Sequence, residues 1–449
     1  MGSLRVGKLA KHLLAAGHDA RVICGDADPE GGSLPLELPA ERVTTTRWYD
    51  INALPRSLQS WRKALNGHDA TAPAATGTAA ATSGGDGGGL LRQLGQLYTN
   101  ALNVPDSRIG WTPHALRAAK SVLAEWRPDL IYASAPPHTV FVIADRLARR
   151  FDIPWLAEYR DRWSEDPYDD PPLPPWRSWI DRRVEDRLLR GAAGIVTVSE
   201  PWAADYRARW GKRTCVAYNG YDAADFAALS AIAPARSAEL NIVYTGILYP
   251  NRRDPSPLLK ALAGMGAEAD NIRVHFYGAD PALLNPSIEQ HGVERLVHVH
   301  GRVSYRESLR LQAQADVLLL LQWNDPRERG NCPGKLFEYL ASRRPILLLG
   351  YPQGVPATLI GERQAGVVAN EPAEIAAALR RWLERKKSRG VIDLLPSAAA
   401  AGMSRGEQYG RVEKFIAETV APGARAGDHN RTSAGGGWLR KAVGLAVKP

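Results

Sequence analysis

Apolar residues near the start of the chain follow a helical spacing. They lie at Leu4, Val6, Leu9, Leu13 and Leu14, and they predict a helix over 3–16 that ends at Gly17. A short strand over 20–24 follows at once. Because a doubly wound α/β domain normally opens with a strand, we expect the first strand of this domain to be missing. We therefore expect that the true start of the protein lies upstream, or that Met1 is not the natural initiator.

Short apolar runs alternate with helical patterns through the rest of the first half. The predicted strands lie within 127–139, 153–163 and 192–200, and the predicted helices cover 112–126, 138–150 and 175–190. Alternation of strands and helices indicates parallel pairing with right-handed crossovers. The first half of the chain therefore predicts one doubly wound sheet.

A second set of strands begins near residue 240. Its apolar runs are LNIVYTG, NIRVHFYG, LVHVHGRV, DVLLLL and RPILLLG, between 240 and 350. Asparagine, glycine, proline and alanine loosen the pattern just before this set, which favours a domain boundary near 228–238. We predict an α/β protein with two Rossmann-like doubly wound domains, at 1–232 and 233–404. A helix at 405–421 is a candidate to return to the first domain.

Two segments offer little to bury. The stretch 71–89, TAPAATGTAAATSGGDGGG, predicts a disordered loop, and 422–449 predicts a basic flexible tail. The tail ends in GWLRKAVGLAVKP, where apolar and basic residues mix. Two interpretations stay open for it: a short helix on an anionic membrane surface, or a disordered solubilising tail.

Composition and charge narrow the class of protein. The 449 residues include 45% hydrophobic and 23% charged residues, as in an ordinary soluble protein of two domains. A net charge of +9 favours anionic partners, but no nucleic-acid-binding motif is present, so no nucleic acid is expected. Cys24, Cys215 and Cys332 have neither disulfide nor zinc spacing. We expect a cytoplasmic protein, with attachment to the inner face of the membrane as an option.

The segment 332–350, CPGKLFEYLASRRPILLLG, carries the most informative chemistry. It predicts a turn, a helix that begins near Lys335 and a buried strand. Helix N-terminal N–H groups and the Lys335 ammonium suit a diphosphate, and Glu338, one turn later, suits the hydroxyls of a ribose. A surface Lys–Glu pair at the start of an ordinary helix is an equally open interpretation.

Several segments in order resemble the retaining glycosyltransferases of family 4, which have the two-domain GT-B fold. PGKLFEYLASRRPIL resembles their donor-site helix and following strand, and ASAPPHT, WLAEYRDRW, VAYNGYD and IVYTGILYPNRRDPSPLLKAL fall in the expected order. The family usually carries an acid eight positions before Glu338, where this chain has Gly330. The resemblance implies donor contacts at Gly246, Arg252, Arg253, Tyr277, Gly301, Gly334, Lys335, Leu336 and Glu338.

The resemblance also suggests residues on the acceptor side. Asp161 follows a predicted strand, and its carboxylate could orient or deprotonate an acceptor hydroxyl; a salt bridge to Arg160 or Arg162 is the alternative. His138 is a second catalytic candidate, with helix capping or packing as its alternative. Gly2 and Ser3 would belong to a glycine-rich loop that approaches phosphate.

Together these residues predict a glycosyltransferase with its two domains facing a cleft. It would move a hexose-type sugar from a nucleoside diphosphate sugar to a hydroxyl of a saccharide or lipid-linked acceptor, with retention, in cell-surface polysaccharide or glycolipid synthesis. No cofactor or metal is expected, because arginine, lysine and a helix N-terminus can offset the diphosphate charge. The alternatives are a sugar-nucleotide epimerase of the same fold and a non-catalytic nucleotide-sugar-binding protein.

Overall fold

The computed structural model describes residues 2–26, 38–53, 89–166, 168, 172–227, 229, 236–421 and 441–447. The chain forms two compact units. Unit 1 comprises Met1–Val196, Arg209–Thr214 and Phe415–Pro449, and unit 2 comprises Thr197–Ala208 and Cys215–Lys414. The boundary between them is thus crossed several times. Most of the segment predicted as a disordered loop, 71–88, lies outside the described residues.

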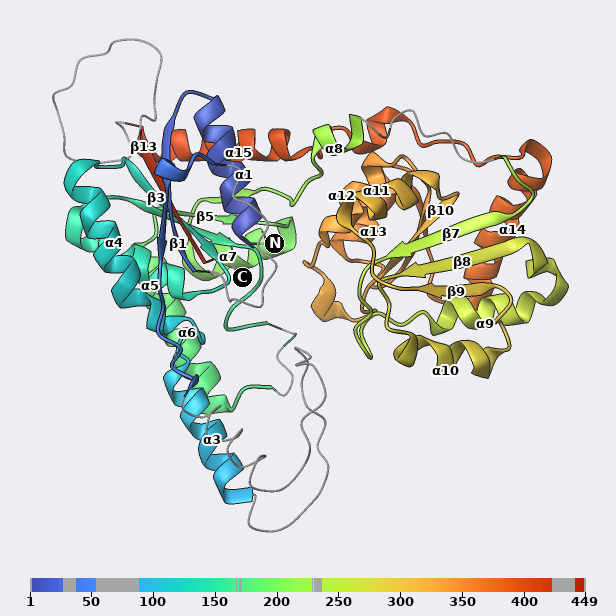
Figure 1. Ribbon diagram of the computed structural model, residues 1–449, viewed down its shortest axis with the longest axis horizontal. Helices are drawn as coiled ribbons and strands as arrows, with labels where there is room; N and C mark the ends of the chain where they lie inside the picture. The colour runs from blue at the N-terminus through green and yellow to red at the C-terminus, as the bar shows by residue number, and fades with distance from the viewer. Residues whose placement is uncertain are drawn as a thin grey trace. The chain divides into compact units, whose positions relative to one another are not determined.

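Unit 1 is built around a seven-stranded sheet that helices flank (Figure 1). Its strands are β1 (Asp19–Gly25), β2 (Val43–Thr46), β3 (Leu130–Ala135), β4 (Trp155–Tyr159), β5 (Gly194–Thr197), β6 (Thr214–Val216) and β13 (Lys441–Val447). Its helices include α1 (Gly2–Ala15), α3 (Gly89–Leu102), α4 (Thr112–Glu125), α5 (Thr139–Phe151), α6 (Pro175–Gly191) and the end of α15 (Arg405–Val420). The buried apolar patterns of β3, β4 and β5 explain why these strands lie inside the sheet.

The strand order of unit 1 is β2-β1-β13-β3-β4-β5-β6. β13 pairs in parallel with β1 on one side and with β3 on the other, as Figure 1 shows. With β13 counted as the first strand, the order becomes that of a doubly wound nucleotide-binding domain. β13, which follows unit 2 in the chain, therefore occupies the central position of this sheet.

This arrangement corrects two expectations. Residues 441–447 are neither a flexible tail nor a membrane-surface helix but a strand, because the sheet has an open central position with pairing partners on both sides. Gly2 and Ser3 lie in the first turn of helix α1 and not in a glycine-rich loop.

Unit 2 contains a six-stranded parallel sheet with helices on both faces (Figure 1). Its strands are β7 (Leu240–Thr245), β8 (Ile272–Tyr277), β9 (Val297–His300), β10 (Val317–Leu321), β11 (Ile346–Leu349) and β12 (Gly366–Val368). Its helices include α7 (Glu200–Trp210, as far as Ala208), α8 (Ala223–Ala227), α9 (Ser256–Met265), α10 (Pro281–His291), α11 (Tyr305–Gln314), α12 (Gly334–Ala341), α13 (Val355–Glu362) and α14 (Pro372–Arg389). Side chains of α9, α10 and α14 share one buried cluster with the sheet, and those of α12 and α13 share another.

The sheet order in unit 2 is β12-β11-β10-β7-β8-β9. The strand order reverses between β7 and β10, which are direct neighbours. Ligands of doubly wound sheets bind beyond the carboxyl ends of the strands at such a switch point. The loops after β7 and β10 are therefore where a ligand of unit 2 is expected. Two doubly wound parallel sheets confirm the predicted fold class.

Candidate active site

Lys335 lies at the switch point of the unit 2 sheet. It is the second residue of α12, and its Nζ donates a hydrogen bond to the carbonyl oxygen of Thr245, at the end of β7, over 2.8 Å. The ammonium also sits 4.4 Å from the ring centroid of Tyr244. Burial, with a smaller contribution from Arg253, lowers the pKa of Lys335 to about 7, and Glu338 opposes this shift. Burial thus disfavours the protonated form of Lys335, and an anionic ligand bound beside the ammonium would stabilise that form.

Gly246 lets this ammonium lie directly against the backbone. Its φ is 141°, in the region that favours glycine, and a methyl group there would collide with Lys335 Nζ. The Gly246 N–H donates to Tyr277 O over 2.8 Å, and the Gly278 N–H donates to Gly301 O over 3.2 Å. These bonds tie together the ends of β7, β8 and β9. The sequence-predicted Gly246, Tyr277 and Gly301 therefore lie along one edge of the sheet.

Glu338 lies one helical turn after Lys335 on α12. Its Oε2 accepts a hydrogen bond from Gln312 Nε2 over 3.2 Å, and Tyr305 also hydrogen-bonds to it. Burial raises the pKa of Glu338, while Gln312, Arg405 and Lys335 act against that shift. Gln312 Nε2 also donates to Thr245 Oγ1 over 3.2 Å, so this amide joins α11, β7 and α12. The side-chain oxygen of Gln312 is buried and has no hydrogen-bond donor among the described atoms.

Gln312 and Tyr305 are site residues that the sequence analysis missed. Both belong to α11, and the amphipathic pattern of that helix accounts for them without any role in a site. No spacing signal in the sequence marks them out. Only the packing of α11 against β7 brings them to Glu338.

The two arginines of the β7–α9 loop separate in the structure. Arg253 lies on the Lys335 side: it donates to Ile247 O over 3.0 Å, and its charge lowers the pKa of Lys335. Arg252 lies 5.2 Å from the ring centroid of Trp323, in the loop after β10, on the ring that Arg327 approaches to 4.0 Å. Both arginines are half-buried and belong to loops beyond the carboxyl ends of the strands. Their contact with a donor remains a prediction.

The remaining donor-side candidates have different surroundings. Gly334 opens α12 with free space around its Cα, and Gly301 is similarly open. Leu336 is fully buried in the core, and its N–H donates to Pro333 O over 3.1 Å. The structure thus gives Leu336 a packing role in α12. Tyr277 stacks on His300 with centroids 4.3 Å apart and planes 10° apart, which makes a flat, half-exposed surface at the end of β8.

The absence of an acid at position 330 has a steric reason. Gly330 is buried against the indole of Trp202, and a side chain at this position would overlap the ring. A carboxylate therefore cannot occupy position 330 unless Trp202 moves. The neighbouring Glu328 is buried and also does not present an exposed carboxylate.

The acceptor-side candidates lie after β3 and β4 of unit 1. His138 caps the start of α5, is buried, and stacks on Trp163 at 5.0 Å. Burial, followed by the charge of Arg160, lowers the pKa of His138 to about 3, so the imidazole is neutral near pH 7. Its Nε2 has no hydrogen-bond partner among the described atoms. Asp161 is exposed as a residue. Neighbouring protein atoms nevertheless desolvate its carboxylate and raise its pKa, and the charge of Arg160 opposes that shift.

A buried ion pair beneath these residues escaped the sequence analysis. Arg5 Nε on α1 and Glu158 Oε1 on β4 are 2.6 Å apart, and both side chains are buried. Burial acts to raise the pKa of Glu158, but Arg5, aided by Arg160, outweighs it, so the pKa is lowered. Arg160 donates to the carbonyl oxygens of Ala135 and Pro136 and fixes the turn before His138. The signal for this network was the lone acid Glu158 inside an apolar strand.

Comparison with known proteins agrees with this geometry. A glycosyl transferase 4-like domain matches residues 2–220, and a glycosyl transferases group 1 domain matches residues 239–385. No curated protein matches the chain. A glycosyltransferase structure from Rickettsia africae aligns over 94% of this chain and 95% of its own, with a TM-score of 0.59 and 12% identity. Anabaena Alr3699/HepE in complex with UDP and glucose aligns over 90% and 99%, with a TM-score of 0.52 and 18% identity.

The two sheets and the two matched domains define the class: this chain is a glycosyltransferase with the GT-B fold. Within that class it is of the family 4-like type, as the sequence motifs predicted. The match to these glycosyltransferase domains favours sugar transfer over the two alternative functions, which are epimerisation of a sugar nucleotide and non-catalytic binding of one. None of the described helices is long and apolar enough to cross a membrane.

Proposed function

We propose that the enzyme transfers a hexose-type sugar from a uridine diphosphate sugar to a hydroxyl group, with retention of anomeric configuration. The observation that carries the proposal is the buried ammonium of Lys335 against the backbone of Thr245 and Gly246 at the switch point. A diphosphate placed there would accept hydrogen bonds from Lys335 and from N–H groups at the start of α12. The uridine nucleotide is proposed from the UDP bound to the Anabaena protein.

Each part of the donor has a proposed partner in unit 2. Glu338, held by Gln312, would accept hydrogen bonds from ribose hydroxyls. The Tyr277–His300 stack offers a flat surface for the base. As the sugar leaves, negative charge develops on the diphosphate, and Lys335 and Arg253 would stabilise it. These contacts supply the transition-state stabilisation that the reaction requires.

On the acceptor side, we propose that Asp161 orients the acceptor hydroxyl and accepts its proton. An exposed carboxylate at the end of β4 suits this role. Neutral His138 would act as a hydrogen-bonding group through Nε2. The acceptor is proposed to be a saccharide or lipid-linked saccharide in cell-surface polysaccharide or glycolipid synthesis, which rests on the family resemblance.

The direct experiment is incubation of the protein with UDP-glucose, UDP-galactose or UDP-N-acetylglucosamine and a cell-envelope saccharide fraction. We expect release of UDP and a product whose anomeric proton coupling in NMR shows the α configuration of the donor. An Asp161→Asn variant should bind the donor normally and transfer slowly. A β product would refute retention, and binding of only non-uridine nucleotide sugars would refute the donor assignment.

Donor binding should weaken as pH rises through 7. The diphosphate binds the protonated ammonium of Lys335, whose pKa in the free protein is about 7, so above that pH a proton must be taken up on binding. Affinity for a UDP-sugar should fall by up to about tenfold per pH unit between roughly pH 7 and 9. Calorimetric titration at several pH values measures this slope. A Lys335→Met variant, which has no titrating group, should show weak binding that does not change with pH; an unchanged slope in that variant would contradict the assignment.

A further inference from the structure

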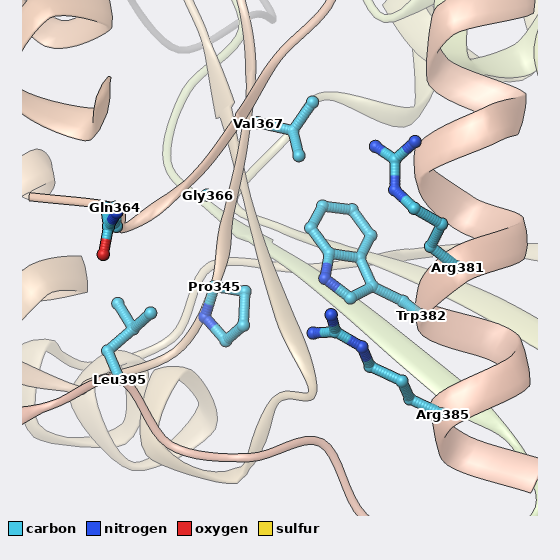
Figure 2. Close-up of a pocket in the computed structure, with 8 residues that line it drawn as sticks. All are labelled: Pro345, Gln364, Gly366, Val367, Arg381, Trp382, Arg385 and Leu395. Atoms are coloured by element: carbon cyan, nitrogen blue, oxygen red, sulfur yellow. The ribbon is translucent and has the colours of Figure 1, made fainter. Parts of the chain in front are cut away.

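A concave site lies at the opposite end of the unit 2 strands from Lys335. Pro345 directly precedes β11 and Gly366 opens β12, so this pocket stands at the amino ends of the parallel strands. Its volume is about 200 Å³. Figure 2 shows the residues that line it, which we call the α14 pocket: Pro345, Gln364, Gly366, Val367, Arg381, Trp382, Arg385 and Leu395. Because the donor site lies beyond the carboxyl ends, the two sites are separate.

Two arginines that line the α14 pocket have no acidic partner among the described residues. Arg381 and Arg385 are four residues apart on α14 and therefore share a helix face. Among the described residues, neither guanidinium makes a hydrogen bond or an ion pair, and no acid lines the pocket. Elsewhere on α14, Arg380 pairs with Glu268 at 2.7 Å and Lys386 with Asp316 at 2.6 Å. The pocket thus concentrates cations that the protein itself does not neutralise.

The rest of the lining is apolar or neutral and polar. The indole of Trp382 lies between the two guanidinium groups, and all three side chains extend from α14 toward the strand segment of Pro345 and Gly366 (Figure 2). Trp382 is 5% exposed, so its ring is a fixed wall and not a mobile surface group. Gln364, exposed and held in a left-handed backbone conformation with φ of 49°, adds an amide. An apolar wall flanked by hydrogen-bonding groups is the usual environment of a sugar.

We propose that the α14 pocket binds a small phosphomonoester of the size of a hexose monophosphate. Two guanidinium groups recognise a phosphate dianion through paired N–H donors. The exposed edge of the Trp382 ring would contact the attached sugar, and the Gln364 amide would hydrogen-bond to its hydroxyls. The volume of about 200 Å³ lies below the roughly 300–1,000 Å³ of pockets for larger ligands, which favours a small ester over a nucleotide sugar. This site goes beyond the proposed transfer reaction and does not depend on it.

The test is isothermal titration of the whole protein with glucose 6-phosphate, with glucose as the uncharged comparison. We expect saturable binding of the phosphate ester at about 150 mM salt and none of glucose. The double variant Arg381→Ala/Arg385→Ala should weaken binding at least about tenfold, since it removes two charge-assisted contacts. The matched control, Lys387→Ala/Arg389→Ala, removes the same charge from the end of α14 outside the pocket and should bind as wild type.

Three results would overturn the proposal. Equal weakening in both double variants would show that general positive charge, and not the pocket, attracts the ester. Failure of glucose 6-phosphate to bind, together with binding of phosphatidic acid vesicles that requires Arg381 and Arg385, would assign the surface to a membrane. Loss of UDP-sugar binding in the Arg381→Ala/Arg385→Ala variant would show that the pocket is part of the donor site; unchanged UDP-sugar binding is expected.

Discussion

Replacing Lys335 with methionine should remove most donor binding without destabilising the protein. The substitution keeps the length of the side chain and deletes a charged hydrogen-bond donor, which is worth about 1.5–3 kcal/mol, or roughly ten- to hundredfold in affinity for a UDP-sugar. In the free protein the buried ammonium opposes folding, because burial lowers its pKa. The variant should therefore unfold at the same or a higher temperature near pH 7. Calorimetric titration and thermal unfolding measure the two effects.

The pH dependence of stability provides a second check on Lys335. Between the folded pKa of about 7 and the ordinary value of 10.5, the unfolded chain holds a proton that the folded chain does not. Protons then favour unfolding, so the contribution of Lys335 to the free energy of unfolding rises with pH across this window. Lys335→Met should lose this contribution, and the exposed control Lys260→Ala should keep both it and donor binding. Normal UDP-sugar affinity in Lys335→Met would remove Lys335 from the donor site.

Deleting residues 441–449 should unfold unit 1 while unit 2 keeps its structure. β13 lies between β1 and β3, and its loss would leave both neighbours with unpaired backbone groups in the middle of the sheet. Hydrogen exchange read by mass spectrometry should show rapid exchange throughout β1 and β3 and slow exchange in β7 and β10. A synthetic peptide that contains residues 441–447, added in trans, should restore protection in β1 and β3.

Single substitutions separate strand pairing from a general effect of truncation. Val443→Pro removes a backbone donor in a central strand and should resemble the deletion. Val443→Ala keeps the donor and serves as the matched control, with protection close to that of the wild type. Unchanged protection of β1 and β3 after the deletion would mean that β13 does not pair with them in solution.

The strands of unit 2 were predictable because their apolar runs are long and bounded by glycine or proline. DVLLLL and RPILLLG have the length of buried parallel strands, and β10 and β11 occupy them. Residues 441–447 were not predictable, since a short apolar run beside basic residues fits a surface helix as well as a strand. What decides between the two is pairing with β1 and β3, which lie more than 300 residues earlier in the chain. Periodicity carries no information about such a distant partner.

The donor-side residues were predictable to a similar extent. The motif marked Lys335 and Glu338 as neighbours on one helix, and the structure places both at the switch point. The burial of the ammonium was not predictable, because it depends on Tyr244 and Thr245 from another strand. The pairing of Arg5 with Glu158 is likewise a tertiary contact, across 153 positions in the chain.

The central place of β13 also sets the order in which the protein can fold during synthesis. A ribosome delivers β1 and β3 early, but the strand between them emerges only after all of unit 2 has been made. The nascent N-terminal half must therefore wait with two exposed strand edges, while the later unit folds first. Domains usually fold in the order of translation, whereas the sheet of unit 1 cannot be completed until β13 has followed unit 2 from the ribosome.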